Sequence, residues 1–129
     1  KAIEINPTNL HVLNNYSYYL TLHRKDLDKA EKMSSITIKA EPTNATYLDT
    51  YAWVLFEQEA YIMSKIYIEK AIEYGKEESS AEVYEHYGDI LSMSGDIDKA
   101  VEQWIKAKEL GGDSKVLKKK IKRKKYYKK

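Results

Sequence analysis

The sequence repeats itself with a period near 35 residues, and this repeat limits the folds that the chain can adopt. The segment Asp26–Lys32 (DLDKAEK) returns as Asp96–Glu102 (DIDKAVE) 70 residues later, which is two periods. Pro7 and Pro42, each followed by Thr-Asn, lie 35 residues apart. A period of this length along the chain is typical of an array of stacked units rather than of a single compact core.

Each unit of the repeat predicts two helices joined by a short turn. Asp26 and Asp96 suit the helix N-cap, where a carboxylate accepts from free backbone N–H groups. Gly75 and the Gly111–Gly112 pair suit left-handed C-terminal caps, and Gly95 suits a tight turn. No strand pattern is present, so the fold class is all-α. We expect first helices over 9–23, 45–58 and 81–94, and second helices over 26–41, 61–74 and 96–110.

Small residues recur at corresponding positions of these helices, 34 to 36 residues apart, with large side chains around them. Two helices can cross closely only where the side chains at the contact are small. We therefore expect the crossings at Ser17, Ala52 and Gly88 of the first helices and at Ala30, Ser64 and Ala100 of the second. The large residues expected around the crossings are Leu13, Tyr16 and Leu20, then Leu48, Tyr51 and Leu55, then Tyr84, Tyr87 and Leu91.

The two later units resemble the tetratricopeptide repeat (TPR) family, of bacterial type. The matching stretches are YAWVLFEQEAYIMSKIYIEKAIEYG and YGDILSMSGDIDKAVEQWIKAKELGG, and the resemblance covers roughly residues 1–112. The first unit departs from the pattern, with an extra residue in its inter-helix turn and Ser34 at a position that is usually large. The resemblance implies a right-handed superhelical stack of antiparallel helix pairs, an α-solenoid, with Trp104 in its core.

The resemblance also divides the chain. It implies the end of a preceding repeat at 1–7, repeats at 8–42, 43–78 and 79–112, and a capping helix with a basic tail at 113–129. Asp113 or Ser114 can cap that last helix, expected over 114–122, whose apolar Val116, Leu117 and Ile121 would cover the final repeat. Beyond Lys122 we expect fraying, because the lysines repel one another and little remains to bury.

In the family, the first helices line a concave groove that binds peptides or extended segments of partner proteins. The amides among the groove residues can bond a peptide backbone, the aromatic rings suit hot spots, and the acids favour a polar or basic segment. The Lys and Arg of a clamp for a C-terminal carboxylate are absent from these helices. Two other interpretations stay open, that Trp53 is a packing residue and that the acids form a solvated face. The resemblance assigns partner contacts to Asn14, Asn15, Tyr18, Asp49, Thr50, Trp53, Phe56, Glu85, His86 and Asp89.

The net charge of +2 hides a strong asymmetry. Residues 115–129 hold ten Lys and Arg and no acid, which leaves twelve basic and twenty acidic residues elsewhere. An alternative function is therefore a charge-anchored spacer whose basic tail docks on a membrane or on nucleic acid. Nucleic acid is the weaker candidate, because no structured basic groove accompanies the tail. A plain helix cap with a soluble end also stays open. The candidate anion contacts are Lys118, Lys119, Lys122, Arg123, Lys124 and Lys125.

The sequence offers no set of residues for catalysis. There is no cysteine, and no glycine-rich phosphate loop is present. Glu82, Glu85, His86 and Asp89 share a helical face, but such metal sites need further ligands from a second helix. We expect no enzyme activity, no cofactor, no metal and no small-molecule substrate, but a non-catalytic scaffold for protein partners.

Location and assembly stay open. The stretch LDTYAW (Leu48–Trp53) resembles units of bacterial repeat proteins, many of them envelope-associated. The bacterial cytoplasm and the periplasmic side of the envelope are both open, because the chain starts at Lys1 without a Met that would show a leader. Self-association is open as well, since a truncated array exposes apolar surface at its N-terminal end.

Overall fold

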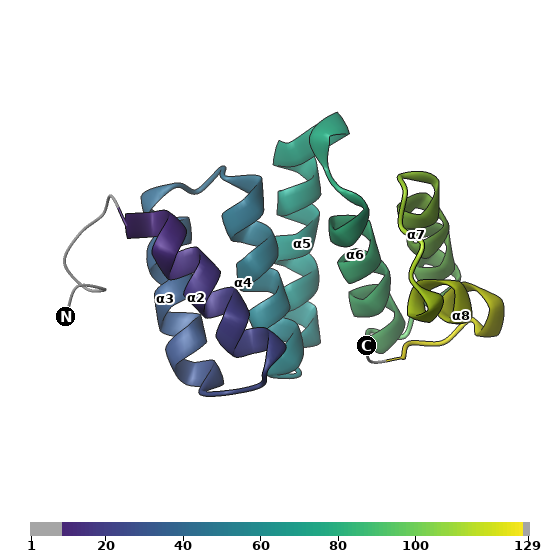
Figure 1. Cartoon of the computed structure of the whole chain (residues 1–129), viewed down its shortest axis with the longest axis horizontal. Coiled ribbons are helices and arrows are strands. Elements are labelled where there is room, and N and C mark those ends of the chain that lie inside the picture. Colours follow the sequence, from purple (N-terminus) through teal and green to yellow (C-terminus); the bar gives the residue numbers. More distant parts are fainter. Residues whose placement is uncertain (1–8, 128–129) are drawn as a thin grey trace. The chain divides into compact units, whose positions relative to one another are not determined.

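The computed structural model describes residues 9–127, and these residues form helices joined by short turns (Figure 1). The predicted all-α class is confirmed, and each predicted helix end lies within one residue of the observed end. The expected end of a preceding repeat, residues 1–7, lies outside the described residues. The helices are α2 (Leu10–Leu22), α3 (Leu27–Ala40), α4 (Ala45–Glu57), α5 (Tyr61–Gly75), α6 (Ala81–Met93), α7 (Ile97–Glu109) and α8 (Lys115–Arg123), with a 3₁₀ turn η2 (Lys76–Glu78) after α5.

The chain divides into two compact units. Unit 1 ends at Gly75 and holds α2 to α5, in which α2, α3 and α4 contact one another and α4 also packs along α5. Unit 2 begins at Lys76 and holds α6 to α8, in which α7 packs against both α6 and α8. Each unit therefore contains antiparallel helix pairs of the kind that the sequence repeat predicts.

The helix ends follow the local sequence. The side chains of Asp26 and Asp96 each accept a backbone N–H three residues on, which confirms both as N-caps. Ser114 does the same for α8, at 3.0 Å from the backbone nitrogen of Leu117. Gly95 and Gly111 have positive φ angles of 95° and 107°, which only glycine adopts without strain. The cap predicted at Gly75 is wrong, because α5 includes Gly75 and the left-handed residue is Lys76.

The crossings in unit 1 occur at the small residues that the repeat predicts. Ser17 on α2 donates from Oγ to the carbonyl oxygen of Ala30 on α3, at 2.8 Å. Ser64 on α5 donates in the same way to the carbonyl oxygen of Ala52 on α4, also at 2.8 Å. All four residues are fully buried. A small side chain with one hydroxyl thus lets two helices approach and adds a hydrogen bond across the crossing.

The crossing in unit 2 uses glycine instead. A Cβ at Gly88 on α6 would overlap the indole ring of Trp104 and would lie 3.0 Å from the carbonyl oxygen of Ala100 on α7. The glycine therefore provides the space into which Trp104 packs. Trp104 is completely buried, which confirms its prediction as a core residue.

The core of unit 2 extends into α8. Leu117 is buried with Trp104 and Ala107, and Ile121 packs on the same cluster, so α8 covers the last helix pair as expected. Tyr126 also packs against this cluster, and Lys125 donates its backbone N–H to the carbonyl oxygen of Lys120. The helix ends at Arg123, and beyond it Tyr126 adds an apolar contact with the core. The fraying expected beyond Lys122 stays a prediction.

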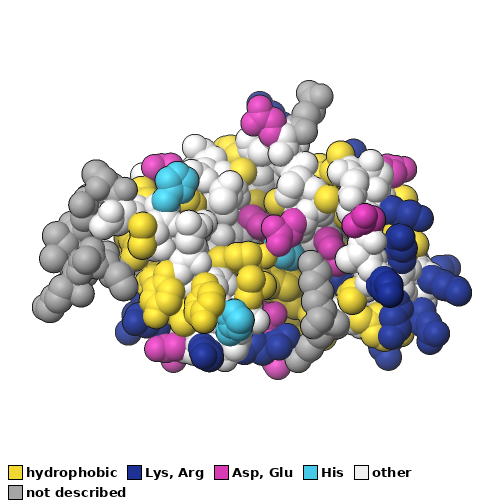
Figure 2. Space-filling view, viewed as in Figure 1, with side chains coloured by type: hydrophobic (Ala, Val, Ile, Leu, Met, Phe, Trp, Pro, Cys, Tyr) yellow, Lys and Arg dark blue, Asp and Glu magenta, His cyan; other side chains and the backbone are white. Residues whose placement is uncertain are grey.

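The exposed face of α2 is unusually apolar. Tyr16 is one of the large residues expected around the first crossing, yet it is exposed and its ring stacks on that of Tyr19, with centroids 6.3 Å apart. Figure 2 shows hydrophobic side chains gathered over this part of the molecule. The exposed large residues of α2 are Val12, Tyr16, Tyr19 and Leu22.

Candidate interaction surfaces

The groove residues predicted on α4 are buried. Asp49, Thr50, Trp53 and Phe56 are each at most 8% exposed. The rings of Trp53 and Phe56 stack with centroids 4.4 Å apart and planes 13° apart. Their predicted exposure is wrong, because α2, α3 and α5 all pack against this one helix. The packing interpretation of Trp53 is the one that its 7% exposure supports.

The partner contacts predicted on α2 differ in their exposure to solvent. Asn14 is buried, and its Oδ1 accepts no hydrogen bond from the part of the chain that the structure describes. Asn15 is exposed and Tyr18 is half-buried. His11 is exposed too, and its ring meets the edge of Tyr47 at 6.1 Å between centroids. Of the ten predicted partner contacts, Asn15 and Tyr18 are therefore the two that reach the surface.

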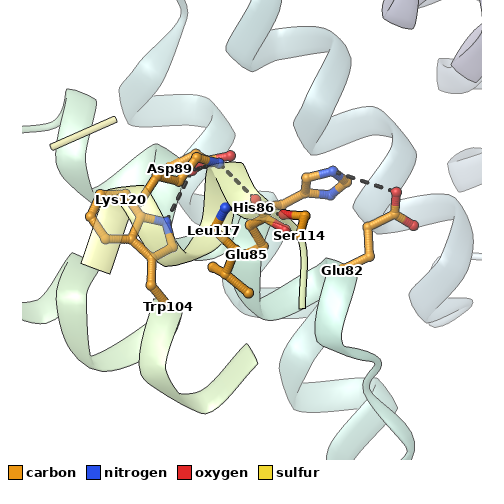
Figure 3. A network of polar contacts seen from close by, with 8 residues as sticks. All are labelled: Glu82, Glu85, His86, Asp89, Trp104, Ser114, Leu117 and Lys120. Atoms are coloured by element: carbon orange, nitrogen blue, oxygen red, sulfur yellow. Dashed lines mark hydrogen bonds and ion pairs between the residues drawn. The ribbon is translucent and has the colours of Figure 1, made fainter. Parts of the chain in front are cut away.

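The predicted contacts on α6 are buried as well, and two of them hold a lysine of α8 (Figure 3). The Nζ of Lys120 donates to Glu85 Oε2 at 2.8 Å and lies 2.8 Å from Asp89 Oδ1. The indole Nε1–H of Trp104 donates to the same oxygen of Asp89, at 3.0 Å. Lys120 is 1% exposed and Asp89 is 2% exposed. The acids predicted to meet a partner thus bind a cation of their own chain.

A buried charge is tolerated when it is paired and hydrogen-bonded, and this cluster meets that condition. Burial raises the pKa of Asp89 to about 6, and the charge of Glu85 acts in the same direction. Lys120 and His86 oppose this rise in pKa, because a cation favours the ionised carboxylate. His86 is itself buried and lies 4.0 Å from Glu82. One ammonium group is therefore shared between two buried carboxyl groups.

Sequence reasoning missed Lys120, which stood among the tail lysines without a role. A signal was available, because Leu117, Lys120 and Ile121 are spaced i, i+3 and i+4 and so share one helical face. A lysine that is buried on the apolar face of a capping helix almost always has an acid as its partner. The acids at the groove positions of α6 provide it.

The candidate anion contacts all reach the surface. Lys118, Lys119, Lys122, Arg123, Lys124 and Lys125 are exposed, and Figure 2 shows the basic side chains gathered at the α8 end of unit 2. The Nζ of Lys119 lies 4.3 Å from the ring centroid of Tyr127, and that of Lys125 lies 5.8 Å from it. Both cations thus contact a tyrosine ring that belongs to the same segment.

Two other kinds of site are absent from residues 9–127. Within that range no group of three or more His, Cys, Asp and Glu side chains could hold a metal ion. None of the helices described is long and apolar enough to cross a membrane.

Comparison with known proteins identifies the fold. No protein-family model matches the sequence, and no curated protein matches it. Among solved structures, the chain is similar to the first TPR of Spaghetti (RPAP3), which is bound to the HSP90 peptide SRMEEVD. That match has a TM-score of 0.79 at 13% identity and covers 93% of each chain.

Two further structures agree. The TPR domain of Arabidopsis OM64 has a TM-score of 0.79 at 19% identity, over 91% of this chain and 94% of that one. The N-terminal domain of stress-induced protein-1 from C. elegans has a TM-score of 0.69 at 25% identity, over 96% of this chain and 98% of that one. With its helix pairs and small-residue crossings, the chain therefore folds as a tetratricopeptide-type helical repeat.

Proposed function

We propose that this chain is a non-catalytic interaction module that binds a segment of a partner protein on the exposed side of α2. The observation that supports the proposal is that Asn15 and Tyr18 reach the surface together, one helical turn apart, at positions that line the groove in TPR proteins. The helix that carries them crosses α3 at the buried Ser17–Ala30 hydrogen bond, so both side chains have a rigid base.

The chemistry of this face suits a peptide. The amide of Asn15 can donate to and accept from a peptide backbone, and Tyr18 offers a flat apolar ring with a polar edge. His11 and Leu22 extend the face in both directions at helical spacing, and Leu22 is 53% exposed. The four residues form one stripe along α2, which we call the α2 stripe.

The partner that fits is a polar segment rather than an acidic C-terminus. The Spaghetti (RPAP3) domain holds the peptide SRMEEVD, which ends in acids. In this chain, α2, α4 and α6 contain no Lys or Arg. An acidic peptide would therefore lose its hydration without meeting a cation on these helices, which is unfavourable.

A peptide array tests this function. The full chain is screened against an array of synthetic peptides that samples polar, basic and acidic sequences, and the tightest peptide is carried forward. Because hot-spot truncations cost about 2 kcal/mol or more, Asn15→Ala combined with Tyr18→Ala should weaken binding by roughly thirtyfold. Circular dichroism checks that the variant keeps its helices.

Tyr74→Ala is the matched control, because Tyr74 is an exposed tyrosine of the same unit on α5, outside the α2 stripe. It should leave the affinity unchanged. The proposal fails if Tyr74→Ala weakens binding as much as the double variant, or if the array selects only acidic C-terminal peptides.

A further inference from the structure

The two sides of α8 differ in chemistry. Leu117 and Lys120 are buried and Ile121 is partly buried, so these three residues face the rest of unit 2. At 3.6 residues per turn, the opposite side of the helix collects the remaining cations. Those cations are Lys115, Lys118, Lys119, Lys122 and Arg123, all of them exposed.

Two contacts fix the orientation of these cations. The side chain of Leu117 sits in the core beside Trp104, and the ammonium group of Lys120 is held between Glu85 and Asp89. Rotation of α8 about its axis would break both contacts. The exposed cations are therefore arranged in advance rather than distributed along a flexible tail, and binding them to a surface costs less ordering entropy.

The turn after α8 adds to the same charged region. Lys124 and Lys125 are exposed, and the backbone N–H of Lys125 bonds back to Lys120. From Lys115 to Tyr127 the sequence holds no acid. We call the seven exposed cations of this region the basic face: Lys115, Lys118, Lys119, Lys122, Arg123, Lys124 and Lys125.

We propose that the basic face binds the surface of an anionic lipid bilayer and so attaches unit 2 peripherally to a membrane. This goes beyond the proposed function, because it involves other residues and another class of partner. A cation near an anionic bilayer gains about 1 kcal/mol, which is roughly a fivefold change in partitioning per residue. Several cations at one surface therefore give useful but reversible binding.

The aromatic residues favour a bilayer over nucleic acid. Single-stranded nucleic acid is usually held by aromatic rings that stack on bases. Tyr126 packs on the core of unit 2, and the ring of Tyr127 lies below Lys119 and Lys125. Both rings are therefore engaged within the chain. The basic face then offers mainly point charges, which suit headgroups on a flat surface.

Vesicle flotation tests the proposal with the full chain. The protein is mixed with vesicles of phosphatidylcholine alone or of phosphatidylcholine with phosphatidylserine, at low and at high salt. It should float with the anionic vesicles at low salt and separate from them at high salt, because salt screens exposed charges. It should not float with the neutral vesicles.

Two variants with the same change in charge provide the sharper test. Lys119→Met removes a cation of the basic face and should weaken binding to anionic vesicles about fivefold. Lys120→Met removes a lysine whose charge is held by buried carboxylates, while Leu117 still holds α8 on the core. We therefore expect less than about a twofold change in vesicle binding. The two residues are neighbours in sequence, and only the docked orientation of α8 separates them.

A third variant guards against loss of folding in Lys120→Met. This variant combines Lys120→Met with Glu85→Gln and Asp89→Asn, so that neutral groups of similar shape replace the buried charges. Vesicle binding should again change less than about twofold. Combining Lys118→Met, Lys119→Met and Lys122→Met should weaken binding by roughly a hundredfold.

Several outcomes overturn the proposal. Equal weakening by Lys119→Met and Lys120→Met would show that the cations act as a tail without orientation. Flotation with neutral vesicles, or no flotation with anionic ones, would remove the lipid surface as the partner. Tighter binding to duplex DNA than to anionic vesicles at the same salt would favour nucleic acid. The double variant Asn15→Ala, Tyr18→Ala should float with anionic vesicles as the unaltered chain does. The flotation result therefore does not depend on the proposed function.

Discussion

Lys120 and Trp104 meet at a single oxygen atom, Oδ1 of Asp89, with the lysine Nζ at 2.8 Å and the indole Nε1 at 3.0 Å. One carboxylate of α6 therefore joins α7 and α8, while Glu85 takes a further bond from the same lysine. A buried charged cluster of this kind is worth little against an apolar equivalent but is costly to break. It fixes which side of α8 faces the core.

Lys120→Met should strongly destabilise the fold near pH 7. The methionine fills similar space but leaves Glu85 and Asp89 buried without their cation, and such a loss costs about 3–5 kcal/mol. Urea unfolding followed by tryptophan fluorescence measures the change. Lys119→Met, on the exposed side of the same helix, should stay within about 0.5 kcal/mol of the unaltered chain. Equal effects from both would contradict a buried ion pair.

Asp89 should make stability depend on pH below neutrality. Burial raises its folded pKa from 3.8 to about 6, so in this window the folded state binds more protons than the unfolded state. The free energy of unfolding should therefore fall as pH rises from about 4 to about 6, by about 3 kcal/mol from this residue. Urea unfolding at a series of pH values measures the slope.

Asp89→Asn isolates that contribution, because the asparagine is neutral throughout. The difference in unfolding free energy between the unaltered chain and this variant should shift by about 3 kcal/mol across the same window. Asp98→Asn removes an exposed acid from the first turn of α7 and serves as the control for the loss of one carboxylate from the same unit. A constant difference for Asp89→Asn would show that this carboxyl keeps an ordinary pKa.

Gly88→Ala should destabilise the chain by about 1–3 kcal/mol, because the added methyl group would overlap the indole of Trp104. The near-ultraviolet circular dichroism of that tryptophan should change with it. Gly95→Ala is the comparison, since its added Cβ meets nothing within 4 Å and its cost comes only from the φ of 95°. It should leave the tryptophan signal as it is; the steric account fails if the two variants behave alike.

Ser17→Ala and Ser64→Ala should have matching effects. Each removes one buried hydrogen bond across a helix crossing without a change in size, which costs about 0.5–1.5 kcal/mol. Ser17→Leu should cost more, because the crossing has no room for a larger side chain. Thermal unfolding compares the three variants. A neutral Ser17→Leu would show that the crossing is looser than the buried hydrogen bond implies.

The sequence by itself determined the helices and their crossings. Asp26 and Asp96 could be recognised as N-caps from the sequence, because each side chain bonds to a backbone group only three residues on. The small residues Ser17, Ala52 and Gly88 recur at the repeat period, and a periodic pattern reports the contacts that every unit shares. Local bonds and repeated contacts can both be deduced from the order of residues alone.

The exposure of the candidate site depended on the tertiary structure. Trp53 and Phe56 had the spacing of groove residues, but packing of three helices around α4 buried both. Glu85 and Asp89 looked like surface acids until α8 brought Lys120 to them. Such contacts occur once, between residues distant in sequence, so the 35-residue repeat does not report them. Burial is a property of what lies opposite a side chain, and only the folded chain determines that.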